Sequence, residues 1–318
     1  MQVPSACTRC RPSRVVDMNL TIAKLAAAIR EGRGIGTGDA YRPWIQITRR
    51  TSSPYSNLNV CPVPHLKRLT HFLSRAERQF ALYLWWLGAE DVREQYPLWP
   101  WPHLHPEVQI APQAEDRLHP GMQFVAAEAD IALRTYPGTT IAHVLTIDMM
   151  VTVPVSMNPA RLIGISCKPE AIVVAGSPTD RDMERIELDR RYCVAGNIPF
   201  RLAHPEQLPP KLLVGLHAIS PIEPRSTLMQ LVRAAPYLKY VDLLQRTAYD
   251  RPAWIASKEA GNRVGWSTPE EQRAFHIAIW YQHVDHDVSN GLVTTRPLVA
   301  GGTALREQGR QRWFGEGA

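Results

Sequence analysis

Two apolar runs joined by a short polar segment stand out within residues 141–174 of the chain. β-Branched residues are frequent in both runs, and turn-forming residues occupy 154–160, so the pattern predicts two strands joined as a hairpin. Each run contains one charged residue in an apolar setting, Asp148 in the first and Lys168 in the second. Pairing of the strands would bring these two charges side by side. Ser166 would lie on the same face as Lys168, because side chains two residues apart in a strand point the same way.

A carboxylate and an ammonium group inside apolar strands have two interpretations. Burying an ion costs several kcal/mol unless it is paired or binds a metal. The first interpretation is a half-buried salt bridge between Asp148 and Lys168. The second is a nuclease metal site, in which Asp148 holds a divalent ion and Lys168 orients the attacking water or balances phosphoryl charge. A third residue is needed to decide between them.

Glu77 is the candidate for that third residue. Apolar residues recur at helical spacing up to residue 87, and Gly88 follows them, which predicts a helix. Ser74 and Glu77 have the S-x-x-E form of a capping box, so a purely local role explains the glutamate. Glu77 nevertheless shares a face with Phe80, and it can therefore point toward the sheet on which the helix packs. A carboxylate there would complete a metal site.

The remaining pattern up to residue 205 predicts one α/β domain. A strand is expected at 91–98 and an irregular loop at 99–119. A helix capped near Thr179 should end at Gly196, and a short strand at 197–202 is limited to a sheet edge by Pro199. The order helix, strand, strand, strand, helix, strand predicts a mixed sheet flanked by helices.

Both ends of the chain have their own patterns. A helix at 20–29 precedes a glycine-rich stretch, 32–38, which lacks the lysine of a P-loop and suits a basic arm on the DNA backbone. Residues 1–19 are expected to be a disordered extension or an over-called start, because Met18 resembles a natural beginning. The proline-rich segment 205–210 predicts a domain boundary.

The C-terminal part is predicted to be mainly helical. Helices are expected at 228–248, with a break near Pro236, and from Thr268 to about His286, where threonine, proline and glutamate form a start signal. A short strand or wing at 291–298 completes the expected winged-helix domain over 206–298. Residues 299–318 are expected to be a polar, frayed tail.

Composition narrows the class of protein. A length of 318 residues fits two domains, and a formal charge of +6 suits a polyanionic partner. No apolar run reaches the roughly 18–20 residues that span a bilayer, and the beginning lacks the layout of a signal peptide, so we expect a cytoplasmic protein without membrane contact. Five scattered cysteines argue against a disulfide framework. Cys7 and Cys10 lack a second pair for zinc, and the HVDHD stretch at 283–287 scatters its side chains around a solvated helix end.

Taken together, Glu77, Asp148 and the triplet ending in Lys168 resemble the PD-(D/E)xK arrangement of restriction-endonuclease-like nucleases. The surrounding segments resemble, over about residues 20–205, the TnsA endonuclease subunits of heteromeric TnsABC-type transposases, and residues 206–298 match their winged-helix domain more loosely. The segments that carry the resemblance are GRG at 32–34, YRPW at 41–44, FLS at 72–74, DVREQYPL at 91–98, HP at 119–120, TIDMM at 146–150, CKP at 167–169 and the helix at 184–192.

The resemblance implies a Mg²⁺-dependent DNA endonuclease, with Mn²⁺ as a substitute metal. Glu77, Asp148 and Lys168 match the catalytic positions, and Glu77, Asp148 and Ser166 the metal site. The family cuts the 5′ ends of a transposon, while a TnsB-like transposase cuts and joins the 3′ ends and a TnsC-like ATPase binds the C-terminal domain. Double-stranded DNA at the transposon ends and these two proteins are therefore the expected partners.

One departure from the family's motif leaves alternatives open. The family usually has glutamine two residues before the lysine, where this chain has Ser166, whose shorter hydroxyl would reach a metal only through water. A non-catalytic DNA- or partner-binding subunit with a weakened site is one alternative, although all three charged residues are retained. A stand-alone restriction or repair nuclease is the other, and activity without partners would favour it.

Overall fold

The computed structural model describes residues 21–48, 58–111, 117–158, 161–170 and 179–315. The expectations for residues 1–19, including the pair Cys7 and Cys10, lie outside the described residues. Within the described ranges, no helix combines the length and the apolar character needed to cross a membrane.

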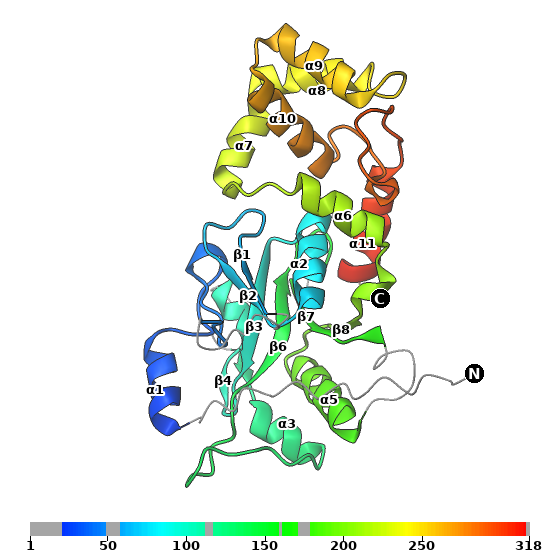
Figure 1. Ribbon diagram of the computed structural model, residues 1–318. Coiled ribbons are helices and arrows are strands. Elements are labelled where there is room, and N and C mark those ends of the chain that lie inside the picture. Colours follow the sequence, from blue (N-terminus) through cyan, green and yellow to red (C-terminus); the bar gives the residue numbers. More distant parts are fainter. Residues whose placement is uncertain (1–20, 49–57, 112–116, 159–160, 171–178, 316–318) are drawn as a thin grey trace, which may run out of the picture.

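A four-stranded mixed sheet forms the centre of the molecule, in the order β3-β6-β7-β8 (Figure 1). Antiparallel pairs join β3 to β6 and β6 to β7, and a parallel pair joins β7 to β8 at the edge. The predicted mixed sheet is confirmed, as is the edge position of its last strand. The bounds are Asp91–Leu98 for β3, Leu145–Thr152 for β6, Leu162–Cys167 for β7 and Phe200–Ala203 for β8.

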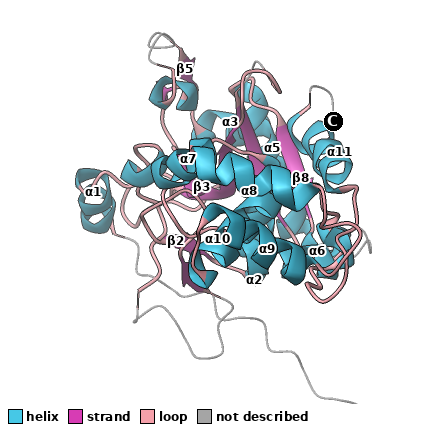
Figure 2. Ribbon diagram, turned by 90° about the horizontal axis from the view of Figure 1, so that it is seen from above, coloured by secondary structure: helices cyan, strands magenta, loops and turns pink. Residues whose placement is uncertain are grey.

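Helices cover both faces of this sheet. Helix α2, Arg75–Leu87, packs on one face through a core that includes Phe80 and Ile165. Helices α3, Met122–Glu128, and α5, Asp180–Ala195, share the second core on the other face. Figure 2, seen from above, places α2 and α5 on opposite sides of the strands. The order helix, strand, strand, strand, helix, strand is therefore found as α2, β3, β6, β7, α5, β8.

The part of the chain before β6 also forms several shorter elements. The region expected to be an irregular loop contains a two-stranded antiparallel sheet and a 3-10 helix, and the seven-residue α3 was not predicted, because so short a run gives little periodic signal. These elements are α1 Ile22–Arg30, η1 Gly38–Ala40, β1 Asn59–Cys61, β2 Thr70–Phe72, β4 His103–Leu104, η2 Pro106–Gln109 and β5 Leu118–His119.

Beyond β8 the described chain is helical, and α7 to α10 form a lobe above the sheet (Figure 1). Helix α10 begins at Thr268, as predicted, with Ser267 as its N-cap in a capping box with Glu270, but it ends at Trp280, short of the expected His286. The bounds are η4 Pro205–Gln207, α6 Pro210–Ile219, α7 Arg225–Arg233, α8 Ala235–Gln245, α9 Ala253–Val264, α10 Thr268–Trp280, η5 Val288–Asn290 and α11 Gly302–Phe314.

The expected wing at 291–298 is not a strand. Its backbone carbonyls at Thr294 and Arg296 instead accept hydrogen bonds from the N–H groups of Trp254 and Ala253, at 3.0 and 2.9 Å. Helix α9 begins after Pro252 without a capping side chain, so these carbonyls satisfy its first free N–H groups. The segment acts as a cap, and the winged-helix assignment stays a prediction without its β element.

The frayed tail was also a wrong prediction. Residues 302–314 form α11, whose Trp313 and Phe314 are buried, and the Trp313 ring meets Phe80 of α2 edge to face with centroids 4.6 Å apart. Asp285 accepts the N–H groups of Gly301 and Thr303 at the start of α11, at 2.9 and 2.7 Å. The stretch at 283–287 is therefore a connection that caps α11, and not a solvated helix end.

Candidate active site

Helix α2 places Glu77 through its own N-terminal cap. The Ser74 hydroxyl oxygen accepts the Glu77 N–H at 3.1 Å, and the same hydroxyl donates to Glu77 Oε1 at 2.9 Å. The N–H of Leu73 donates to Oε2 at 2.9 Å. Only 5% of Glu77 is exposed, so the carboxylate also faces the interior. The local role and the inward orientation, weighed as alternatives from the sequence, are both present.

Pairing of β6 with β7 brings Asp148 and Lys168 together. Asp148 Oδ2 accepts the backbone N–H of Cys167 at 2.7 Å, and Lys168 Nζ donates to the same oxygen at 3.3 Å. Both side chains are largely buried, with 15% and 19% exposed. The half-buried salt bridge of the first interpretation is therefore present.

Glu77 joins these two residues electrostatically. Burial raises the pKa of Glu77, and the neighbouring negative charge of Asp148 raises it further, to about 8. Burial alone would lower the pKa of Lys168, but the charges of Asp148 and Asp189 outweigh that effect and raise it. Lys168 thus stays protonated near neutral pH. Glu77 thus lies near enough to Asp148 and Lys168 to interact with their charges, and the role of these three residues as one site stays a prediction.

Ser166 binds a carboxylate of α5, Asp189, whose charge also acts on Lys168. Its hydroxyl is fully buried and donates to Asp189 Oδ2 on α5 at 2.7 Å. Arg185, one turn earlier on α5, pairs with the other oxygen of Asp189 at 3.0 Å. Asp189 was not predicted, because its helix is mostly polar and has no continuous apolar face that would mark the residue as buried.

Gln95 was missed as well, and it touches Glu77 directly. Its side-chain amide donates from Nε2 to Glu77 Oε2 at 2.9 Å, and its Oε1 accepts the hydroxyl of Thr146 at 3.0 Å. All of β3 is buried, and nothing in its sequence distinguishes Gln95 from the neighbouring polar residues Arg93 and Glu94.

No protein-family model matches the chain. The chain is 27% identical over 188 residues to the transposition protein TnsA of transposon Tn7 from Escherichia coli. The matching region covers 59% of this chain and 58% of that relative, which is less than two thirds of either protein. The similarity is distant, and the mixed α/β sheet described above is compatible with a nuclease fold.

The donor set of the cluster limits which metal it can hold. Among the residues that the structure describes, no three His, Cys, Asp or Glu side chains lie together as a metal-binding group. Glu77 and Asp148 provide hard carboxylate oxygens, and both hydrogen bonds to Asp148 from described residues go to Oδ2. Mg²⁺ keeps several waters and binds proteins through one or two carboxylates, whereas zinc favours three or four nitrogen or sulfur ligands. The pair fits Mg²⁺ better than zinc.

Proposed function

We propose that this protein is a Mg²⁺-dependent DNA endonuclease subunit of a transposase, which hydrolyses phosphodiester bonds at the 5′ ends of a transposon. The observation that carries the proposal is the buried carboxylate of Glu77 beside the Asp148–Lys168 pair. A salt bridge alone has no use for a second buried carboxylate, whose burial and like-charged neighbour both cost free energy. The distant similarity to TnsA supports the same assignment.

Glu77 and Asp148 would hold the metal, and Mn²⁺ would serve in place of Mg²⁺. A divalent cation would offset the mutual repulsion that raises the pKa of Glu77. We leave Ser166 out of the direct ligands, because its hydroxyl is committed to Asp189. When bound, Mg²⁺ supplies an activated water and neutralises charge on the phosphate.

The chain's own residues orient the reacting groups. The backbone N–H of Cys167 fixes the Asp148 carboxylate, and Lys168 stays protonated because its pKa is raised. Its ammonium group is therefore a fixed cation, suited to stabilising the negative charge that develops on a phosphate oxygen. The sheet between α2 and α5 supports a restriction-endonuclease-like fold as part of the proposal.

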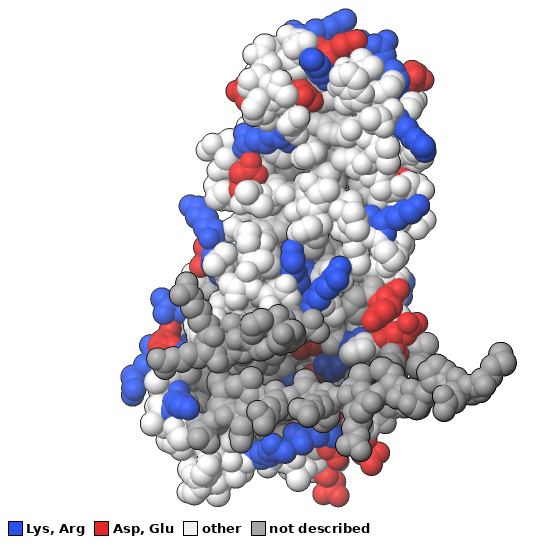
Figure 3. Space-filling model, in the orientation of Figure 1, with Lys and Arg blue, Asp and Glu red and all other residues white. Residues whose placement is uncertain are grey.

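DNA and two proteins are the proposed partners, namely a TnsB-like transposase and a TnsC-like ATPase. On the face seen in Figure 3, lysine and arginine side chains extend from the helical lobe to the sheet region, with acidic side chains between them. The formal charge of +6 favours association with DNA through its phosphates. We assign the helices after β8 to partner binding.

A cleavage assay tests the proposal. The purified protein, with Mg²⁺ or Mn²⁺, is incubated with DNA that carries the transposon ends, with and without the TnsB-like and TnsC-like partners. Nicking at the 5′ ends is expected only with partners. Asp148→Ala should abolish it, because the metal loses a ligand. Lys168→Ala should slow it by about 10²–10³-fold, the usual cost of losing a group that stabilises developing charge. The exposed Glu128→Ala on α3, which lies outside both the site and the helices after β8, is the control and should cut normally.

The other outcomes of the assay favour other functions. Cutting without partners would favour a stand-alone nuclease. No cutting under any condition, with partner binding intact, would favour a non-catalytic subunit. Circular dichroism of Asp148→Ala checks that the variant folds, since loss of its fold would support the purely structural salt bridge.

A further inference from the structure

Gln95 lies in β3 with a backbone conformation that glutamine rarely adopts. Its φ is +48°, in the left-handed region, although it stands inside a strand. On either side of it the pairing of β3 with β6 is regular, with Glu94 opposite Met149 and Tyr96 opposite Ile147. The position between them would pair Gln95 with Asp148, and that pair is missing from the register. The irregular residue thus lies beside the aspartate of the site.

The core to which β3 contributes changes across Gln95. Val92 belongs to the core beneath α2, whereas Tyr96, four residues later, belongs to the core on the α5 side. In a regular strand these two residues would share a face. The reversal therefore occurs between them. It leaves the Gln95 side chain free to reach α2 on one side and β6 on the other.

The amide of Gln95 uses both of its ends. Nε2 donates to Glu77 Oε2, and Oε1 accepts the hydroxyl of Thr146, two residues before Asp148. One uncharged side chain therefore ties the helix that carries one carboxylate to the strand that carries the other. Gln95 is fully buried, so water does not compete for these hydrogen bonds.

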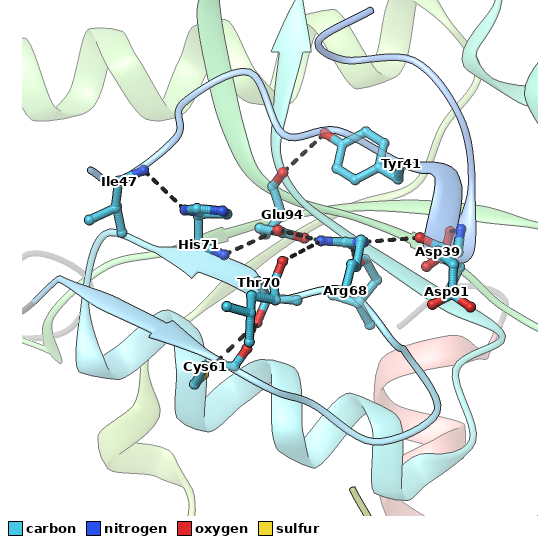
Figure 4. A network of polar contacts seen from close by, with 12 residues as sticks. Asp39, Tyr41, Ile47, Cys61, Arg68, Thr70, His71, Asp91 and Glu94 are labelled. Carbon is cyan, nitrogen blue, oxygen red and sulfur yellow. Dashed lines mark hydrogen bonds and ion pairs between the residues drawn. The ribbon is translucent and has the colours of Figure 1, made fainter. Parts of the chain in front are cut away.

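Several contacts hold the strained backbone in place (Figure 4). Arg68 binds both carboxylate oxygens of Glu94, at 2.7 and 2.8 Å, and the Tyr41 hydroxyl donates to the Glu94 carbonyl at 3.0 Å. The N–H of Trp44 donates to the carbonyl of Gln95 itself at 3.2 Å. Unfavourable φ values persist where the surroundings over-determine them, and they gather at functional sites.

We propose that Gln95 is a positioning residue, whose amide sets the separation of the Glu77 and Asp148 carboxylates for a divalent metal ion. The inference rests on the proposed function, because it takes these carboxylates as the metal ligands. Partners that orient metal ligands through hydrogen bonds commonly change metal affinity by about 10–100-fold when they are replaced.

Three variants separate the amide from the backbone. Gln95→Met keeps the length of the side chain and removes both hydrogen bonds. Gln95→Gly also removes them, but it relieves the left-handed strain. Thr146→Val leaves Gln95 in place and removes the partner of its Oε1. The matched control is Gln109→Met, which removes another amide that contacts β3, through Arg93 and Tyr96, without touching Glu77.

Calorimetric titration of the DNA-free protein with Mn²⁺ is the main measurement. The Mg²⁺ concentration that gives half-maximal 5′ nicking in the presence of partners is the second. Gln95→Met and Gln95→Gly should weaken Mn²⁺ binding about 10-fold or more. They should raise the required Mg²⁺ concentration by a similar factor. Thr146→Val should change both quantities in the same direction by less, and Gln109→Met should change them by less than about twofold.

The outcomes distinguish this inference from the proposed function. Wild-type affinity for Mn²⁺ in Gln95→Met would overturn the positioning role. Wild-type affinity in Gln95→Gly would overturn it too, because it would show that the amide is not needed for metal binding. If the wild-type protein itself binds no Mn²⁺ and cuts with no metal, the proposed function fails first and takes the inference with it. Thermal unfolding in a chelator identifies a variant that does not fold, and Thr146→Val then decides.

Discussion

Two clusters of buried charged side chains lie at strand β3, and the buried glutamate of each has the opposite electrostatic surroundings. Glu94 is fully buried, and the guanidinium of Arg68 binds both of its oxygens (Figure 4). Glu77 is almost as buried, but a second carboxylate, Asp148, adds to the pKa shift that burial causes. The nearest ammonium group, Lys168, bonds to Asp148 and not to Glu77.

The comparison shows that burial alone does not identify a functional acid. Burial raises the pKa of Glu94 as it does that of Glu77, but Arg68 opposes the shift at Glu94, while Asp148 adds to it at Glu77. A charge with a structural role is compensated within the chain. A charge that faces another of its own sign suits a cation that comes from solution, which is the reason to look for function there.

The largest expected effect comes from breaking the compensated group. Arg68→Ala leaves the Glu94 carboxylate buried and unpaired, which should lower the free energy of unfolding by about 3–5 kcal/mol. Urea unfolding measures the loss. The double variant Arg68→Met with Glu94→Leu should recover most of it, because neither charge then remains. Arg75→Ala, at an exposed arginine, is the control, and a loss as small as the control's would remove the contrast between the groups.

The next effect, of opposite sign, is expected from Glu77→Gln in protein freed of metal. Because the folded-state pKa of Glu77 is raised from 4.5 to about 8, the folded state holds a proton in this window that the unfolded state releases. Stability from this group is complete below about pH 4.5 and is lost as the pH rises toward 8, with a limiting slope of about 1.4 kcal/mol per pH unit. The variant should lose that slope and be the more stable protein at pH 8.

Urea unfolding between pH 5 and 8 in a chelator measures this difference. Saturating Mg²⁺ should reverse the trend in the wild-type protein, because a metal that binds the ionised carboxylates favours the folded state as the proton leaves. If the free energy of unfolding of the two proteins varied with pH in parallel, the pKa of Glu77 would not be raised by its surroundings. The contrast with Glu94 would then have no basis.

The smallest effect is expected at the surface. Hydrogen bonds from Arg190 lower the pKa of Glu187 to about 2, but the pair is well exposed and the solvent screens it. Glu187→Gln should therefore cost less than about 1 kcal/mol, and 1 M NaCl should abolish the difference. A lowered pKa contributes stability above pH 4.5 that is lost as the pH falls toward 2. A loss of unfolding free energy as large as that of Arg68→Ala would show that the exposure of a charged pair does not predict its contribution to stability.

The features that the sequence predicted correctly depend on short-range patterns. Helical spacing and the cap at Ser74 located α2, and two apolar runs joined by turn-forming residues predicted the pairing of Asp148 with Lys168. The role of these residues stays a prediction. The features that sequence analysis missed depend on contacts between distant segments. Nothing local tells that the Ser166 hydroxyl is bound by a helix or that Gln95 turns left-handed, because both follow from packing across the sheet.

The C-terminal errors have a similar cause. Helix α11 is mostly polar, and the apolar pair near its end is too short to give a periodic signal. At 291–298, threonine and valine suggested a strand, but the free N–H groups at the start of α9 use the carbonyls of that segment. In both cases the deciding partner lies far away in the sequence.

The packing of α11 on α2 affects the order in which the protein matures. The helix that carries Glu77 is covered in part by Trp313, a residue that leaves the ribosome long after α2 itself. Until then, the aromatic side chains on that side of α2 lack their final neighbour. We expect a nascent chain halted before α11 to leave this side of α2 uncovered, so that the packing around the helix of Glu77 is complete only once α11 has been made.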